Sequence, residues 1–510
     1  MKILLLSMPD SFEHMPSVAI RMPTGALTSL AGNVDPHHEV AVADLILVEG
    51  RVRETVERLV QEMDPNLVGL SVMSFQRKTA QSIMELVRSL KPEARIAVGG
   101  YDPSLAPEAY MEMGSTVDYI VHGEGEITFR ELLRAVENGG GMDGIAGLSY
   151  RVGERWCHNP GRPVHSLESG DVRLPNRKAR VLTGYTMLGR QVDVVETSRG
   201  CTYDCSFCSI IEMRGRNFHT YSFERVLADI RDARDHGART IFLVDDNITL
   251  NVRRFEALCG AIIEAGLNNL DYIVQGMTSA IASHGETLAP LMRKAGFRYV
   301  FLGIENILEN DLQFLRASAK NISRVEGQNQ GNATLKAIGY LHRHKMYVVG
   351  GLIVGNPDDT RQSIEANLSF ARKYVDWPYI QHPTPYPRTP MTKDFRERGL
   401  IINERLEEYD GTTAVVRSHH LPAEEIEYLR WRAERWMKLR HMPAELLHNP
   451  LFVLRHGRRM LQHTFRGSSI RSLLGLEPER RAFERYRALR QAERAFTFSR
   501  PERSIAGKAA

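Results

Sequence analysis

The chain has 510 residues, which suggests about three domains at roughly 150 residues each. Its hydrophobic fraction of 43% and charged fraction of 25% exclude a disordered chain, a collagen and a disulfide-rich miniprotein. The net charge of +4 gives no reason to expect nucleic acid as a binding partner. No stretch has the ~18 unbroken apolar residues of a membrane-spanning helix, and none forms the core of a signal peptide. We therefore expect a cytoplasmic protein.

Residues 1–145 alternate short apolar runs with helical patterns. The expected strands are residues 2–8, 40–45, 66–73, 95–99 and 119–121, and the clearest helical patterns between them are 52–63 and 80–90. Continuous apolar strands separated by helices predict an α/β domain with a parallel, doubly wound sheet.

Small and polar residues stand where these strands end. Doubly wound sheets bind ligands at the carboxyl ends of their strands, and glycine there lets a large ligand approach the backbone. Ordinary turns would also use glycine, so the residues alone leave both readings open. The candidate ligand-binding residues are Ser71, Ser74, Gly99, Gly100, Gly123 and Glu124.

The first domain resembles the cobalamin-binding domain that precedes many radical S-adenosylmethionine (SAM) enzymes. The resemblance rests on three motifs in chain order: Leu-Ser-x-x-Ser, Val-Gly-Gly and Gly-Glu-Gly-Glu. The resemblance implies a flavodoxin-like fold in which the serines and the Gly-Gly turn line a channel for the cobalamin tail. One departure concerns the Asp-x-His-x-x-Gly motif: Asp10 is present, but Phe12 stands where the histidine would be. Asp35-Pro36-His37 lies at the wrong place in the chain and has Val40 instead of glycine. The resemblance therefore implies cobalamin bound without a protein histidine on cobalt.

Residues 146–190 contain scattered glycine and proline, which predicts a connector with short strands. Cys157 and His158 lie in this stretch, and we expect a plain surface turn there in preference to a metal site.

Three of the five cysteines follow the expected strand 192–196. Cys201, Cys205 and Cys208 have the spacing C-x3-C-x2-C, so three thiols on one loop can surround one metal centre. A structural zinc site needs four ligands, and only Cys259 or His219 could supply the fourth. Iron–sulfur clusters are also held by thiolates, and three thiolates on a four-iron cluster leave one iron open to a substrate. An odd cysteine count without a secretory signal argues against disulfides.

Five more apolar strands follow the cysteine loop, at residues 240–244, 272–274, 299–302, 347–354 and 379–381. Helical stretches separate them. With residues 192–196 they make six β/α units, which predicts a partial β/α barrel with polar residues at the strand ends facing the active site.

The cysteine loop resembles that of the radical SAM superfamily, including an aromatic residue, Phe207, before the third cysteine. The resemblance implies a 4Fe–4S cluster whose open iron binds the amino and carboxylate groups of SAM. It also places Asp245 and Asp246 near the methionyl group, although such residues are common helix caps. By the same resemblance Glu305 lies near the ribose or amino group, and Gly355 and Pro357 lie beside the adenine.

Three polar residues follow the last expected strand: His382, Tyr386 and Arg388. They are candidates for contact with the substrate or with the upper face of cobalamin. The sequence identifies no catalytic acid or base.

The last part of the chain, residues 396–510, has helical patterns, the strongest at residues 424–441. From residue 430 onward there are 19 Lys and Arg against 7 Asp and Glu, so this tail carries +12 and the rest of the chain −8. Residues 451–471 contain no acid. An amphipathic helix with Leu451, Leu454, Leu461 and Phe465 could lie on an anionic membrane, or it could pack these side chains onto the barrel.

The expected organisation is a cobalamin-binding domain at 1–145, a linker at 146–190, a radical SAM domain at 191–395 and a helical region at 396–510.

The two resemblances together indicate a cobalamin-dependent radical SAM methyltransferase of the type called class B. They imply a 5′-deoxyadenosyl radical that abstracts hydrogen from an unactivated carbon, a methyl group carried by cobalamin, and an external electron donor of flavodoxin or ferredoxin type. The substrate would be a small molecule or a lipid, the latter with possible membrane-surface contact. The alternatives are a non-methylating cyclase or oxidoreductase of the same family, and a non-catalytic iron–sulfur or cobalamin sensor.

Overall fold

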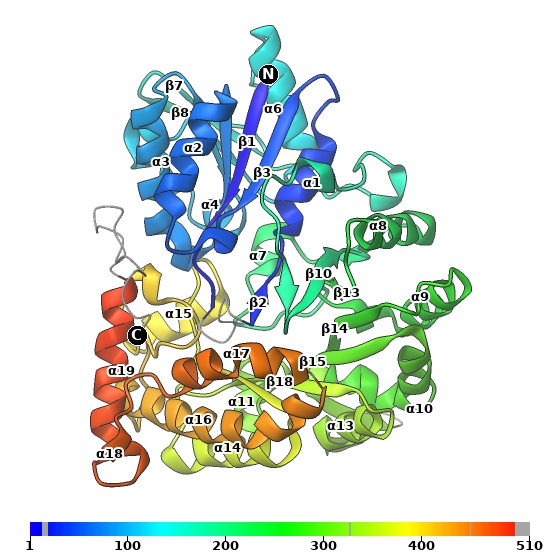
Figure 1. The fold of residues 1–510 in the computed structure, drawn as a ribbon, viewed down its shortest axis with the longest axis vertical. Coiled ribbons are helices and arrows are strands. Elements are labelled where there is room, and N and C mark those ends of the chain that lie inside the picture. The colour runs from blue at the N-terminus through cyan, green and yellow to red at the C-terminus, as the bar shows by residue number, and fades with distance from the viewer. Residues whose placement is uncertain (13–18, 326–327, 449, 495–510) are drawn as a thin grey trace.

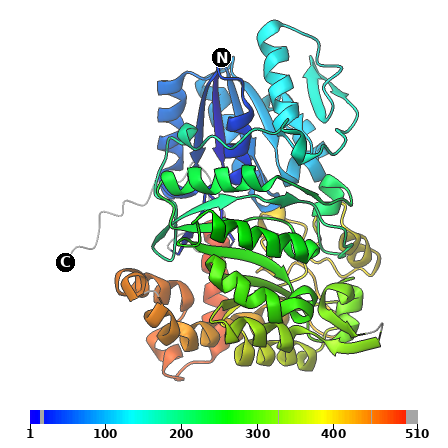
Figure 2. The same cartoon turned by 90° about the vertical axis from the view of Figure 1, so that its right-hand side faces the viewer.

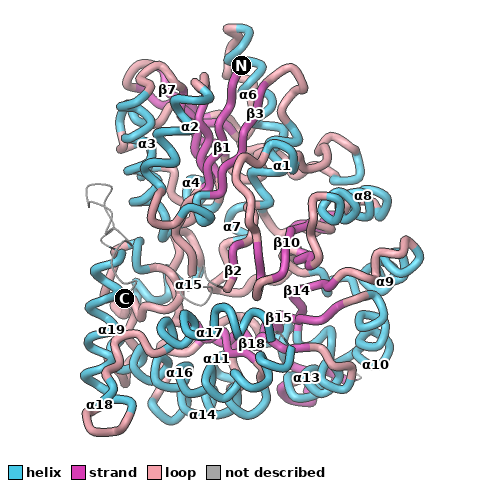
Figure 3. Tube along the Cα trace, in the orientation of Figure 1, coloured by secondary structure: helices cyan, strands magenta, loops and turns pink. Residues whose placement is uncertain are grey.

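The computed structural model describes residues 1–12, 19–325, 328–448 and 450–494 (Figure 1). Its strands form two separate groups, one above the other, with helices on the outside of each (Figure 3). The view turned by 90° keeps this vertical order and shows the C-terminal helices beside the lower sheet (Figure 2).

The upper sheet begins with five parallel strands in the spatial order β3-β1-β4-β5-β6. Numbered along the chain, this is the order 2-1-3-4-5 of a flavodoxin-like fold, so the predicted doubly wound domain is confirmed. The order reverses between β1 and β4, and ligands bind at this switch point in such sheets. The strands are β1 (Lys2–Ser7), β3 (Glu39–Asp44), β4 (Leu67–Ser71), β5 (Arg95–Gly99) and β6 (Tyr119–Val121).

Helices cover both faces of this sheet because its strands are apolar on both sides. Leu4 and Leu6 of β1 pack in one core cluster with residues of α2 and α3, while Ile3 and Leu5 pack in another with residues of α1 and α6. Each fully buried aliphatic side chain contributes roughly 1.5–3 kcal/mol, so both faces stabilise the sheet. The helices are α1 (Gly25–Asn33), α2 (Val52–Met63), α3 (Arg77–Leu90) and α6 (Glu126–Asn138).

The stretch 146–190 contributes short strands to both sheets. β7 (Leu148–Val152) and β8 (Arg155–His158) extend the upper sheet in antiparallel fashion, whereas β9 (Thr186–Met187) joins the lower sheet beside β2 (Ile20–Arg21). Cys157 lies in β8 opposite Tyr150. The expectation of a plain turn at Cys157-His158 is therefore wrong, because this segment is paired as a strand.

The lower sheet contains six parallel strands in chain order, which confirms the predicted partial β/α barrel. These strands are β10 (Arg190–Val195), β13 (Thr240–Leu243), β14 (Asp271–Met277), β15 (Phe297–Glu305), β18 (Tyr347–Ile353) and β19 (Trp377–Gln381). The main helices between them are α8 (Phe223–Asp235), α9 (Val252–Glu264), α10 (Thr278–Ala295), α13 (Thr334–Arg343) and α14 (Arg361–Tyr374). Strands and helices together enclose the largest hydrophobic core of the protein.

Shorter elements lie in the connections. Two small antiparallel ladders pair β11 (Ser198–Arg199) with β12 (His219–Thr220), and β16 (Ile322–Val325) with β17 (Gln328–Asn332). The short helices are α4 (Tyr101–Leu105), α5 (Glu108–Met111), α7 (Ile210–Arg214), α11 (Glu309–Phe314) and α12 (Ser318–Asn321).

The C-terminal region is mostly helical, as predicted, and lies beside the lower sheet (Figure 1). Its helices are α15 (Pro390–Glu397), α16 (Ala423–His448), α17 (Pro450–Thr464), α18 (Ile470–Leu473) and α19 (Glu479–Arg494). Ile426, Leu429 and Met437 of α16 join the barrel core. Within the described ranges, no helix is long and apolar enough to cross a bilayer.

Helix α17 leaves two of its leucines exposed to solvent, whereas the packing alternative expected them to be buried on the barrel. Leu451 is 81% exposed and Leu454 is 78% exposed, while Phe452 is buried. The packing alternative for residues 451–471 is therefore wrong for these two leucines, because the buried side of α17 is the one that carries Phe452 and Gly457.

Candidate functional site

A cavity of about 500 Å³ lies between the two sheets. Its upper wall includes Ser7, Ser71, Gly99, Gly100, Gly123 and Glu124, which follow or end the strands of the upper sheet. Its lower wall includes Glu196, Arg199, Met213, Arg214 and Asp246. The carboxyl ends of the upper sheet's parallel strands and of β10 and β13 in the lower sheet therefore converge on one volume, and strand carboxyl ends are where both fold types bind ligands.

The upper wall requires glycine where the backbone turns. Gly100 has φ +100°, and a Cβ atom there would lie 3.0 Å from the backbone N and O of Val72. Gly123 also has a positive φ. Ser74 is buried and is not among the described lining residues. Asp10 lines the cavity, and its Oδ2 atom is buried without a hydrogen-bond partner. Close backbone access and an unsatisfied acceptor fit a large ligand with amide donors, as cobalamin has.

Arg199 ties the lower wall to the upper wall. This side chain is only 5% exposed and forms ion pairs with Glu126 at 2.5 Å, Glu196 at 2.7 Å and Glu124 at 3.1 Å. Glu124 and Glu126 belong to the upper domain, so the contacts join the two domains at the cavity. Burial alone would raise the pKa of Glu126, but the charge and hydrogen bonds of Arg199 lower it to about 2. Both partners are therefore charged at neutral pH.

The cysteine loop begins at the end of β10, next to this ion cluster. Cys205 is buried, Cys201 and Cys208 are half-buried, and all three are free thiols. Burial raises the pKa of Cys205 to about 11 and that of Cys208 to about 12, so a bound metal would have to replace their protons. Asn247 donates a hydrogen bond to Cys201 Sγ at 3.5 Å.

The two aspartates after β13 have different positions. Asp245 is buried and accepts hydrogen bonds from the backbone and side chain of Thr197 and from Ser198, at the start of the cysteine loop. Burial raises the pKa of Asp245 to about 6. Asp246 lines the cavity and accepts hydrogen bonds from Gly200 N at 2.8 Å and from Arg214 at 3.2 Å. Asp245 thus holds the loop, while Asp246 faces the ligand space.

Glu305 and Phe207 meet through Lys320. Glu305 has φ +56° and pairs with Lys320 Nζ at 2.9 Å, and the same ammonium lies 5.9 Å from the centre of the Phe207 ring. Burial alone would lower the pKa of Lys320, but the charges of Glu305 and Cys205 raise it above its usual range. The lysine therefore remains a cation beside the cysteine loop.

Gly355 and Pro357 follow β18. Gly355 has φ +104°, and a Cβ atom there would lie 2.8 Å from Ile426 of α16, so only glycine fits. Its N–H and that of Asn356 donate to Asp359 Oδ2 at 2.8 and 2.9 Å. The carbonyl of Pro357 accepts from His419 N. Neither residue is among the described lining residues of the cavity.

The three substrate candidates after β19 have protein partners outside the cavity. His382 is buried between the Val354 carbonyl at 3.0 Å and Arg430 Nε at 3.1 Å. The hydroxyl of Tyr386 donates to the Tyr409 carbonyl, and Arg388 pairs with Glu108 on the surface. None of them is among the described lining residues, so their role toward a substrate stays a prediction.

The structure adds residues that the sequence reasoning did not single out. Arg199, Arg214 and Tyr101 line the cavity, and Lys320 lies beside the cysteine loop. Arg199 could have been noticed because it stands two residues before Cys201. Lys320 carries no sequence signal, because it lies far along the chain from the loop it approaches.

Comparisons with known proteins agree with this geometry. The family model of the radical SAM superfamily matches residues 195–371, and the model of the B12 binding domain matches residues 15–133. An uncharacterized methyltransferase of Pyrococcus horikoshii is 28% identical over 436 residues, covering 85% of this chain and 91% of that protein. The hopanoid C-3 methylase of Methylococcus capsulatus is 28% identical over 313 residues, covering 60% of this chain and 56% of that protein.

A solved structure shares the fold. It is TsrM from Kitasatospora setae, a radical SAM methyltransferase determined with cobalamin and a 4Fe-4S cluster bound, at TM-score 0.63 and 19% identity. The match covers 78% of this chain and 75% of TsrM. The chain thus carries a B12-binding domain in front of a radical SAM domain, and the strand ends of the two domains meet at one cavity.

Proposed function

We propose that this protein is a cobalamin-dependent radical SAM methyltransferase that adds a methyl group to an unactivated carbon. The observation that carries the proposal is the single cavity shared by the strand ends of the B12-binding and radical SAM domains. When bound, the cluster and SAM supply hydrogen abstraction and cobalamin supplies the methyl group, so the protein's task is to hold these groups close and exclude water.

Each part of the site has a task under this proposal. Cys201, Cys205 and Cys208 hold the cluster, and Asp245 fixes the start of their loop through Thr197 and Ser198. The glycines of the upper wall admit the corrin ring to the backbone. We propose domain limits of 1–145 for cobalamin, 191–395 for the cluster and SAM, 146–190 for the connector and 396–510 for the helical region. An external donor of flavodoxin or ferredoxin type would reduce the cluster.

The proposal is tested with anaerobically reconstituted protein, a chemical reductant and SAM that carries a trideuterated methyl group. We expect 5′-deoxyadenosine, S-adenosylhomocysteine and a product in which one trideuteromethyl group replaces hydrogen. Candidate substrates are a polycyclic triterpenoid lipid in liposomes and a metallotetrapyrrole, followed by mass spectrometry.

Two outcomes would contradict the proposed methyltransferase function. Formation of 5′-deoxyadenosine with an altered product that has gained no label would favour a cyclase or oxidoreductase. Absence of 5′-deoxyadenosine from protein that contains both cluster and cobalamin would favour a sensor.

We further propose that cobalt carries no protein imidazole. Phe12, at the position of the motif histidine, packs on Phe75 with ring centres 4.8 Å apart, and no histidine is among the described lining residues. His14 belongs to residues 13–18, which lie outside the described ranges. We expect the electron paramagnetic resonance spectrum of the cob(II)alamin form to lack superhyperfine splitting from an axial nitrogen. Splitting that disappears in His14→Ala would overturn this proposal.

A membrane contact would bring a lipid substrate to the site, and the tail carries the features for one. Ile470 and Leu474 are 77% and 67% exposed, close in sequence to the exposed Leu451 and Leu454 of α17. Residues 451–471 contain five arginines and no acid, and Arg455, Arg458 and Arg459 are exposed. Each basic residue near an anionic bilayer contributes about 1 kcal/mol. We propose that α17 and α18 lie on an anionic membrane surface.

The prediction is that the protein co-sediments with liposomes rich in phosphatidylglycerol and that added salt releases it, because screening shortens the electrostatic field. Charge reversal at Arg455, Arg458 and Arg459 should reduce the bound fraction at least tenfold. A matched control reverses the exposed arginines of another face, Arg51, Arg53 and Arg58, and should bind as the parent does. No binding at low salt, or self-association through the exposed leucines seen by gel filtration, contradicts the proposal.

A further inference from the structure

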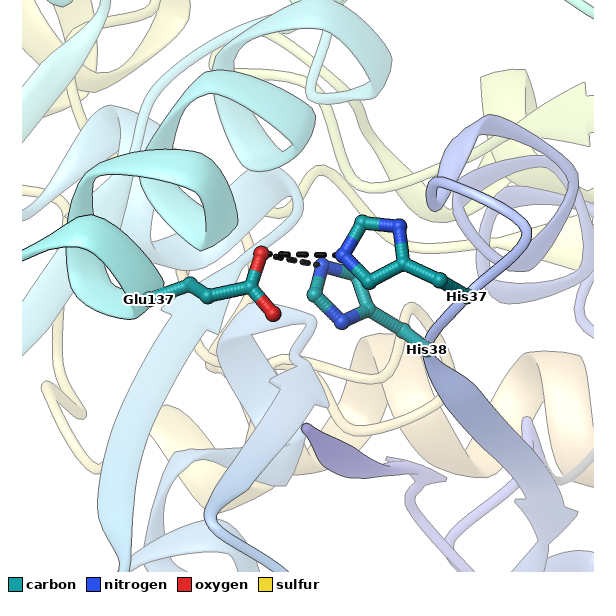
Figure 4. Close-up of side chains that lie close together, drawn as sticks. All are labelled: His37, His38 and Glu137. Carbon is teal, nitrogen blue, oxygen red and sulfur yellow. Dashed lines mark hydrogen bonds and ion pairs between the residues drawn. The ribbon is translucent and has the colours of Figure 1, made fainter.

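Two histidines and a glutamate meet at the end of the upper domain that is remote from the cavity. His37 and His38 lie in the turn between α1 and β3, and Glu137 lies in the last turn of α6, about one hundred positions along the chain (Figure 4). The ligand atoms of all three residues lie within 4.8 Å of one another. Among the described residues, this is the only group of three His, Cys, Asp or Glu side chains whose ligand atoms lie so near one another.

The hydrogen bonds of the protein leave one nitrogen of this group unused. Glu137 Oε2 lies 2.9 Å from His37 Nε2 and 3.8 Å from His38 Nε2. The side chain of His38 is fully buried, and its Nε2 atom has no hydrogen-bond partner. A buried, unpartnered ring nitrogen that faces a second imidazole and a carboxylate is unusual without a ligand.

We propose that His37, His38 and Glu137 form a structural binding site for a zinc ion. Zinc takes imidazole nitrogen and carboxylate oxygen at about 2.0–2.1 Å, which places ligand atoms of a tetrahedral site about 3.3 Å apart. The two measured separations, 2.9 and 3.8 Å, lie on either side of this value. Water would complete the coordination, since three protein ligands leave a position open.

The surroundings suit a cation. Glu137 is at the carboxyl end of α6, where the helix dipole is negative. Burial lowers the pKa of His38, which favours the neutral ring that binds metal. Its Nδ1 atom lies 3.0 Å from the amino group of Met1.

The position suggests what the ion does. β3 begins at Glu39, and its six residues carry the chain roughly 20 Å to the carboxyl end of the sheet where the cavity lies. α6 runs from Glu137 back to Glu126, which holds Arg199 of the cysteine loop. Zinc would fasten the far end of the helix that connects the two domains at the cavity.

The test uses untagged full-length protein in which Cys201, Cys205 and Cys208 are replaced by serine, so that the loop thiols cannot bind zinc. Competition with a chromophoric zinc chelator of micromolar affinity should show one bound equivalent. The X-ray absorption fine structure at the zinc edge should show a nitrogen and oxygen shell with two imidazoles and no sulfur. Millimolar magnesium or calcium should not compete, because those ions prefer oxygen ligands.

Two variants decide the outcome. His37→Ala and Glu137→Gln alter exposed or partly exposed side chains, and each should weaken zinc binding at least tenfold while the circular dichroism stays unchanged. The matched control is His342→Ala, because His342 pairs with Asp376 at 2.8 Å in a similar exposed position but without a second imidazole. Its zinc affinity should equal that of the parent. Absence of competition in the parent, or full affinity in both variants, would overturn the proposal.

Discussion

Replacing Cys201 by alanine is expected to leave the chain without a 4Fe–4S cluster and to reduce 5′-deoxyadenosine formation to background. The reason is that the proposed cluster site consists of three thiols on one loop, with no fourth thiol in the same loop to compensate. Iron content, the visible absorption of the reconstituted protein and the amount of 5′-deoxyadenosine measure the effect. Cys205→Ala and Cys208→Ala should behave in the same way.

The chain supplies its own controls for this experiment. Cys157 lies in β8 of the upper sheet, and Cys259 is fully buried in α9 within the barrel core. Alanine at either position should leave iron content and 5′-deoxyadenosine formation unchanged. A cluster that survives all three loop substitutions, or one that is lost in Cys157→Ala, would show that the ligands have been assigned wrongly.

Arg199→Gln is expected to lower the apparent free energy of unfolding by about 3–5 kcal/mol at neutral pH. Removal of one partner of a buried ion pair leaves the other charge buried and uncompensated. Here the residue removed faces three carboxylates, those of Glu124, Glu126 and Glu196, across the boundary between the domains. Urea unfolding of the full chain, followed by fluorescence, measures the change.

The free energies of unfolding of the parent and of Arg199→Gln should change with pH in opposite directions. In the parent, the pKa of Glu126 is about 2, below its unfolded value of roughly 4.3, so its contribution is present above that value and is lost as the pH falls toward 2. In Arg199→Gln, burial without the arginine raises the carboxylate pKa values. The variant should therefore regain stability between pH 7.5 and about pH 5 as these groups take up protons, and the difference from the parent should shrink.

A second arginine provides a matched control for burial. Arg388 also pairs with a glutamate of the upper domain, Glu108 at 2.9 Å, but the two side chains are 51% and 65% exposed. Exposed pairs of this kind contribute about 0–1 kcal/mol, so Arg388→Gln should lie within that range of the parent. If Arg199→Gln is no more destabilising than Arg388→Gln, the buried cluster does not hold the domains together.

The features that the sequence predicted correctly are those set by residues close together in the chain. The apolar runs predicted the parallel strands of both sheets, because a strand buried on both faces must be continuously apolar. The cysteine spacing is also a local feature, and the cluster site that it predicts at Cys201, Cys205 and Cys208 stays a prediction. Even the order of the two domains could be read from local motifs.

Contacts between distant segments could not be predicted in this way. His382 follows a barrel strand and looked available to substrate, but Arg430 of α16 packs against its Nε2 atom. Leu451 and Leu454 have the spacing of a packing face, yet the docking of α16 and α17 turns Phe452 inward instead. In both cases the position of a C-terminal helix decides the outcome, and helical periodicity does not specify which side of a helix its neighbour will cover.

The sequence by itself therefore determined the two domain types and the cysteine loop, because strand periodicity and ligand spacing are local properties of the chain. Only the tertiary structure decided which side chains share the cavity and which meet elsewhere. Arg199 meets Glu126 from 73 positions away, and His37 meets Glu137 from 100 positions away. Such pairs form because two sheets and their helices stack in one particular way, and that stacking depends on the summed burial of many side chains.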